Sequence, residues 1–157
     1  MAHFAQLDSN NIVIRVAKVD NNDIEGGDYN SKESVGVSFL QSIHGSDTIW
    51  KQTSYNAADT RFRANYAGVG MTYMTGVAAV GVASTDIFID VQPYPSWTVS
   101  TARSDTRWIS PYGDHTALKN HSEGEHANNK LYWWDEAAYQ ADTGSPKTAG
   151  WASTSLS

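Results

Sequence analysis

The residues best suited to chemistry are imidazoles and carboxylates gathered in one polar stretch, residues 114–126. Its candidate ligands are Asp114, His115, His121, Glu123, Glu125 and His126. Such groups build a Zn²⁺ or similar site when three or four of them converge. The spacing of the three His residues matches no helix or hairpin ligand pattern. We therefore interpret the stretch as a solvated polar loop and expect no metal, with a metal site as the alternative.

Other catalytic arrangements find little support in the sequence. The chain has no Gly-x-Ser-x-Gly motif, which would present a nucleophilic serine. Asp135 and Glu136 are adjacent, so on a strand their carboxylates would face apart and could not act as a glycosidase pair. Gly68, Gly70 and Gly76 lack the strand-to-helix context of a dinucleotide-binding loop. We therefore predict that the chain is not an enzyme and holds no cofactor.

Aromatic side chains are the strongest functional signal, and five of the six Trp residues lie between residues 97 and 151. The candidate partner contacts among them are Trp97, Trp108, Trp133, Trp134, Trp151, Tyr94 and Tyr132. Buried rings would simply form a core, whereas exposed rings could fill a pocket on a partner protein or stack on sugars. Because alternate residues of a strand face opposite sides, Trp133 and Trp134 can divide into one core and one contact residue.

Arg61 and Arg63 form a second candidate contact. Two positions apart on an extended segment, they would share one face. Guanidinium groups on that face could pair with an acidic patch on a partner. The alternative is a solvent-exposed edge strand without a partner.

The composition of the chain decides what kind of fold must position these residues. Leu, Ile, Val and Phe account for only 28 of the 157 residues, but six Trp and eight Tyr add fourteen large rings. Turn-forming Gly, Pro, Ser, Thr, Asn and Asp make up 68 residues, which excludes a helical bundle. We predict a mainly β protein: a small antiparallel sandwich or barrel-like domain with one short helix and long loops.

The pattern of apolar residues places the elements. The expected strands cover residues 3–7, 12–19, 48–53, 67–75, 77–83, 86–91, 96–99, 107–109, 131–134 and 150–152. The first two form a hairpin, 67–75 pairs with 77–83 about Gly76, and the last four form two Trp-bearing hairpins. The helix is expected at about 34–44, with Ser31 or Ser34 as N-cap and Gly45 at its end.

At the level of domains, residues 1–92 form a β-rich region with the helix, and residues 93–157 form a Trp-rich hairpin region with a terminal arm. We expect the two to pack as one unit.

Charge and composition exclude several functions. The net charge of −6, with 11 scattered basic residues, argues against nucleic-acid binding. No long apolar run or secretory signal is present, so no membrane partner is expected. There is no Cys, which excludes disulfides and thiolate chemistry.

Five blocks of sequence resemble one family of small proteins of marine bacteriophages, chiefly cyanophages and pelagiphages. The first runs from Met1 to Val13 with the pattern MAHFAQLDxNNIV. The others are GSDTxWKQTSYN at 45–56, RxNYAGxGxTY at 63–73, PYPSW at 93–97 and YxWDE at 132–136. The chain departs from the family pattern at 74–90 and in a longer loop at 110–130.

The resemblance implies a structural protein of the virion, with no catalytic residues to transfer. We expect a capsid decoration or cement protein that bridges neighbouring subunits through aromatic contacts and edge strands. Its partners would be phage structural proteins, either the major capsid protein or tail and neck proteins, in many copies. The alternative is a tail, neck or fibre accessory protein, acting as a glycan-binding module or as a fibre assembly chaperone.

Overall fold

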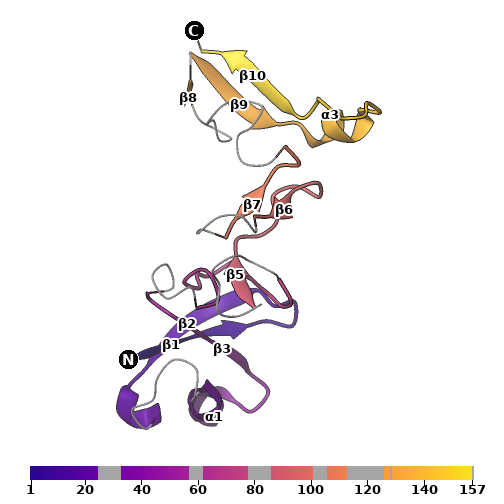
Figure 1. The fold of residues 1–157 in the computed structure, drawn as a ribbon. Coiled ribbons are helices and arrows are strands. Elements are labelled where there is room, and N and C mark those ends of the chain that lie inside the picture. The colour runs from indigo at the N-terminus through magenta and orange to yellow at the C-terminus, as the bar shows by residue number, and fades with distance from the viewer. Residues whose placement is uncertain are drawn as a thin grey trace. The chain divides into compact units, whose positions relative to one another are not determined.

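The computed structural model describes residues 1–24, 33–56, 62–77, 86–100, 106–112, 126–127 and 129–156. Most of its regular structure is β, in small antiparallel sheets (Figure 1), which confirms the predicted fold class. No sheet in these ranges closes into a barrel. The chain divides into two compact units. The first unit is Met1–Val91 with Ser100–Arg107, and the second is Gln92–Val99 with Trp108–Ser157.

The first unit is built on a three-stranded antiparallel sheet of order β2-β1-β3. Its strands are β1 (Ala2–Leu7), β2 (Val13–Val19) and β3 (Ile49–Thr53). The Asp8 carboxylate accepts hydrogen bonds from the backbone N–H groups of Asn10 and Ile12 at 2.8 and 2.9 Å, which closes the turn between β1 and β2. The predicted first hairpin and the strand at 48–53 are therefore confirmed.

One face of this sheet is covered by α1 (Glu33–His44), with a 3-10 turn η1 (Asn21–Ile24) beside it. The buried cluster between them consists of Ala2, Phe4, Val19, Ile24, Leu40 and Trp50. Gly36 faces Phe4 so closely that a Cβ there would lie 2.2 Å from the ring, and this contact explains a glycine inside the helix. The helix is confirmed and ends at Gly45, whose φ is +113°. Ser34 lies inside the first turn and is not the N-cap, and Ser31 falls outside the described residues.

The opposite face of the sheet packs against the hairpin of β4 (Thr72–Met74) and β5 (Ile87–Ile89). A second buried cluster fills this side: Ala5, Leu7, Val13, Ala67, Tyr73 and Phe88. Alternation along β1 divides the two clusters, because Ala2 and Phe4 face α1 while Ala5 and Leu7 face β4 and β5.

The predicted pairing of 67–75 with 77–83 is wrong. One edge of β4 pairs with β5, and its other edge lies against the turn after β1, where the Tyr73 N–H donates to the Asn11 carbonyl at 2.8 Å. Thr72 also forms an isolated bridge with Ile12. Both edges are therefore occupied, and most of the proposed partner strand, 78–83, lies outside the described residues.

The second unit contains two small antiparallel sheets. One is the hairpin of β6 (Thr98–Val99) and β7 (Trp108–Ile109). The other has the order β10-β9-β8, formed by β8 (His126–Ala127), β9 (Lys130–Trp134) and β10 (Trp151–Ser155). Both predicted Trp-bearing hairpins are confirmed.

The prediction of a single helix is wrong, because α3 (Glu136–Ala141) follows β9 directly. Asp135 caps it: the Asp135 side chain accepts a hydrogen bond from the Ala138 N–H at 2.9 Å. Asp135 and Glu136 therefore stand at a helix start and not on a strand. No helix in the described ranges is both long and apolar enough to cross a membrane.

Candidate functional site

Three of the predicted contact residues form one aromatic cluster in the second unit. The ring centroids of Trp97, Trp134 and Trp151 lie 5.5 to 6.1 Å from one another. Tyr94 packs on Trp97 at 5.5 Å, and Tyr139 packs on Trp134 at 5.3 Å. Only 3% of Trp134 is exposed, so this cluster is the core of the unit. The central ring of Trp134 is therefore not free to stack on a sugar, and Trp97 and Trp151 are half-buried.

The Glu136 carboxylate connects Trp134 of this aromatic core to Ser96 and to Gln140 of α3. It accepts hydrogen bonds from the Ser96 hydroxyl at 2.5 Å, the Trp134 indole N–H at 2.8 Å and the Gln140 amide at 2.7 Å. Partial burial raises the pKa of Glu136, but these three donors lower it further, and the net shift is downward. The charged carboxylate therefore fixes the orientation of Trp134.

The other predicted contacts are placed differently. Trp133 points away from Trp134, as strand alternation predicts, and 38% of it is exposed. Tyr132 is buried beside Trp134, and Trp108 on β7 is half-buried. Arg61 falls outside the described residues. Of the predicted Trp contacts, Trp133 thus offers the most open ring among those that the structure describes.

Trp133 lies next to an open strand edge. Gly150 accepts a hydrogen bond from the Asp135 N–H, and the Leu156 N–H donates to Asn129, so even-numbered residues of β10 face β9. The backbone groups of Trp151, Ser153 and Ser155 therefore face away from β9. No described strand lies on that side. The edge carries no charged residue and no proline, the usual protections against pairing with another chain.

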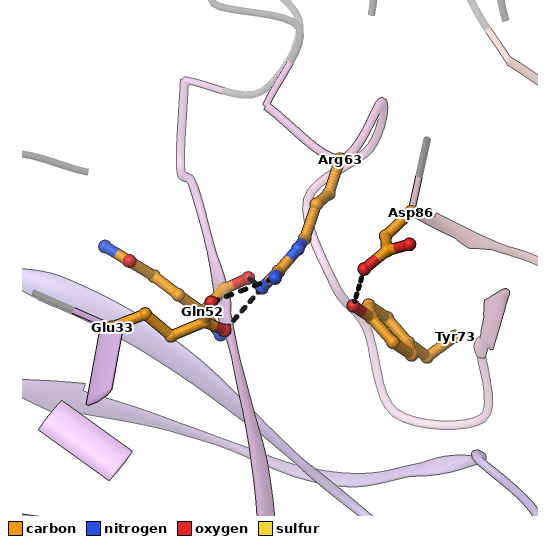
Figure 2. Close-up of polar contacts among 5 residues, drawn as sticks. All are labelled: Glu33, Gln52, Arg63, Tyr73 and Asp86. Atoms are coloured by element: carbon orange, nitrogen blue, oxygen red, sulfur yellow. Dashed lines mark hydrogen bonds and ion pairs between the residues drawn. The ribbon is translucent and has the colours of Figure 1, made fainter. Parts of the chain in front are cut away.

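Arg63 is not the solvent-facing contact that the sequence suggested (Figure 2). Its φ is +53°, so the segment is not extended there, and its side chain is buried. One guanidinium nitrogen donates to Glu33 Oε1 at 2.6 Å and to the Gln52 carbonyl at 2.7 Å, and the other donates to Glu33 Oε2 at 3.0 Å. Burial alone would raise the pKa of Glu33, but hydrogen bonds from Arg63 and from the Gln52 N–H lower it overall. The pair is an internal cross-link between α1, β3 and the chain before β4.

A second polar contact lies near this pair. The Tyr73 hydroxyl donates to Asp86 Oδ2 at 2.5 Å (Figure 2). Burial raises the pKa of Tyr73, and the hydrogen bond to Asp86 raises it further. Tyr73 is therefore a protonated donor at neutral pH, not a general base.

Across the ranges that the structure describes, no three His, Asp or Glu side chains are grouped so that they could hold a metal ion. Of the polar stretch 114–126, only His126 falls in a described range, where its backbone begins β8. The expectation that this stretch binds no metal stays a prediction.

The structure also brings together three rings that the sequence did not single out. The ring centroids of His3 on β1, Tyr55 after β3 and Tyr66 before β4 lie 5.6 to 6.2 Å apart. They are separated in sequence by up to 63 positions and follow no common period. No local pattern could have predicted this group, which we call the ring triad.

The loop between α3 and β10 depends on one carboxylate. Asp142 accepts hydrogen bonds from the backbone N–H groups of Gly144, Thr148 and Ala149 at 2.7 to 2.9 Å. These N–H donors lower the pKa of Asp142 from 3.8 to about 2. The charged form thus organises the chain that leads into β10.

We expect this carboxylate to make the second unit sensitive to acid. Because the folded pKa is below the unfolded one, its contribution to stability is present above pH 3.8 and is lost as the pH falls towards 2. Thermal unfolding of the wild type and of Asp142→Asn between pH 2 and 6 measures this. The variant, which cannot ionise, should be less stable near neutral pH, and the difference should shrink in acid. A difference that is constant across this range would contradict the assignment.

Comparison of the chain with known proteins identifies no similar protein. No protein-family model matches the chain, and no curated protein or solved structure matches it either.

Proposed function

We propose that this chain is a structural protein of a bacteriophage particle that decorates the capsid and bridges neighbouring subunits. The sequence basis is the set of five blocks that resemble the marine phage family. The structural observation that supports the proposal most directly is the uncharged edge of β10, along which no other described strand lies. Such an edge is a ready template for a strand of another chain.

The mode of contact follows from the register of β9 and β10. A partner strand would form backbone hydrogen bonds with Trp151, Ser153 and Ser155, whose N–H and C=O groups face outward. Trp133 lies opposite Ala152 of β10, so these two side chains leave the same face of the sheet. Its exposed ring can add apolar area to the contact. A single short edge gives weak binding, but many identical copies on a lattice multiply it.

The capsid is one of several places in a particle where such an edge could act. The same strand addition would serve a tail, neck or fibre accessory protein, which is the alternative that the sequence left open. A reconstruction of the particle distinguishes these locations. Absence of the chain from purified particles, measured by mass spectrometry, would overturn the structural role and favour an assembly chaperone.

The edge of β10 can be tested with a matched pair of proline variants. The Ser153 N–H faces outward, so Ser153→Pro removes a donor for the partner and keeps the bonds between β9 and β10. Thr154 faces β9, so Thr154→Pro removes a bond of the sheet itself. We expect phage carrying Ser153→Pro to contain on the order of tenfold fewer copies of a protein that is still folded.

The two variants separate binding from folding. Thr154→Pro should lower the melting temperature of the isolated protein, and Ser153→Pro should leave it within a few degrees of the wild type. Full occupancy of particles by folded Ser153→Pro would show that β10 does not dock by strand addition. The location of the chain in the particle would then rest on the sequence resemblance alone.

A further inference from the structure

The ring triad of the first unit is a preformed aromatic surface. His3 and Tyr55 are stacked with an interplanar angle of 29°, and Tyr66 meets both edge-on at 84° and 73°. Each ring thus contacts the other two, which restricts the motion of each side chain before any ligand arrives. A restricted ring loses less entropy on binding than a free one.

These rings are held together and yet remain open to solvent. Tyr55 is 74% exposed and Tyr66 is 37% exposed. Neither belongs to the two buried clusters of the first unit, whose members lie on either side of the sheet. The triad therefore presents flat apolar ring surface together with two phenol hydroxyl groups, a combination that suits the C–H face and the hydroxyls of a sugar.

A positive charge flanks the triad in a chain whose net charge is −6. Lys18 is the register partner of His3 across β1 and β2, so the two side chains leave the sheet on the same face. Burial lowers the pKa of His3, and the charges of Lys18 and of the N-terminal ammonium lower it further. The imidazole is thus neutral near pH 7, and the exposed Lys18 supplies a cation beside the rings.

We propose that the ring triad binds a polysaccharide that carries uronic acids, with a sugar ring stacked on Tyr55 and its carboxylate directed to Lys18. Tyr55, the most exposed ring, is accessible to a repeating polymer that lies along the protein. Contacts with successive sugars then add up. This site is distinct from the Trp cluster, whose central ring is buried, and it does not depend on the proposed role of β10.

The probe is trigalacturonate, titrated into the full-length chain while the ring resonances of His3, Tyr55 and Tyr66 are followed by NMR. Maltotriose serves as the neutral comparison. We expect saturable shifts at the triad with trigalacturonate, and binding of maltotriose that is at least several-fold weaker because it has no carboxylate for Lys18. Raising the salt concentration should weaken binding of trigalacturonate and leave maltotriose unaffected.

Variants assign the binding to residues. Tyr55→Ala should weaken binding of trigalacturonate on the order of tenfold, and Tyr55→Phe should retain most of it because the ring remains. Lys18→Gln should reduce the preference for trigalacturonate over maltotriose. Trp133→Ala, which removes an exposed ring of the second unit, should bind as the wild type does. Equal affinity for both trisaccharides, or full binding by a folded Tyr55→Ala, would overturn the proposal.

Discussion

Trp134→Ala should destabilise the protein by about 3–5 kcal/mol, the usual cost of deleting a buried Trp side chain. The ring of Trp134 contacts Trp97, Trp151 and Tyr139, and 3% of it is exposed. The backbone also closes on it, because a Cβ on Gly150 would lie 2.4 Å from the ring. Such a close fit leaves little room for neighbours to collapse into the cavity.

Trp133→Ala is the matched control, since the same side chain is deleted one residue away. Trp133 is exposed on the other face of β9, so the variant should lose no more than about 1 kcal/mol. Chemical denaturation followed by near-UV circular dichroism, which reports on packed rings, measures both variants. Equal losses of free energy of unfolding would contradict the division of β9 into a core face and a solvent face.

Arg63→Ala is expected to cost about 2–3 kcal/mol, because it leaves a partly buried carboxylate without its partner. The wild-type guanidinium satisfies both oxygens of Glu33 and one backbone carbonyl at Gln52. In the wild type the pKa of Glu33 is lowered, so the stability that the ion pair gives is present above the usual value of 4.5 and is lost as the pH falls below it. The difference in stability between the variant and the wild type should therefore shrink below pH 4.5.

The double variant Arg63→Ala with Glu33→Gln tests this reasoning. Removing the uncompensated charge should restore at least about 1 kcal/mol relative to Arg63→Ala alone, measured at pH 7 by urea denaturation. A double variant that is no more stable than the single one would mean that the loss comes from packing of the arginine stem and not from the orphaned carboxylate.

Those parts of the fold that depend on neighbouring residues could be predicted from the sequence. The turn at residues 8–11 is rich in Asp and Asn, which close turns with their own side chains, and the flanking runs alternate as strands do. The same alternation separated Trp133 from Trp134. The second Trp-bearing hairpin also predicted a strand at 150–152, which in the structure is β10 and runs to Ser155.

Elements whose partners are distant, or whose length is short, could not be predicted in the same way. The partner of β4 is decided by which strand edges are free in the folded unit, and adjacent sequence does not reveal that. The six residues of α3 are too few to show helical periodicity, although Asp135 followed by Glu and two Ala residues is a helix-start signal.

For the candidate contact residues, the sequence likewise could not predict which side chains meet when their positions are far apart in the chain. Arg63 meets Glu33 across 30 positions, and a positive φ turns its side chain into the interior. The ring triad joins three separate segments of the first unit in the same manner. Residue type identified the Trp-rich region as aromatic, but only the fold could decide which rings are covered.

The path of the chain between the two units limits how the protein can be dissected. The polypeptide passes from the first unit to the second after Val91, returns at Ser100 and leaves again after Arg107. The returning segment, residues 100–107, contributes to the structure of the first unit. The Asn65 amide donates to the carbonyl of Thr106 in this segment and also to the carbonyl of Phe88. A fragment cut at residue 91 would leave one of those two bonds unmade. Neither unit can be expressed as one uninterrupted fragment, and isolating the first would require a designed linker or circular permutation.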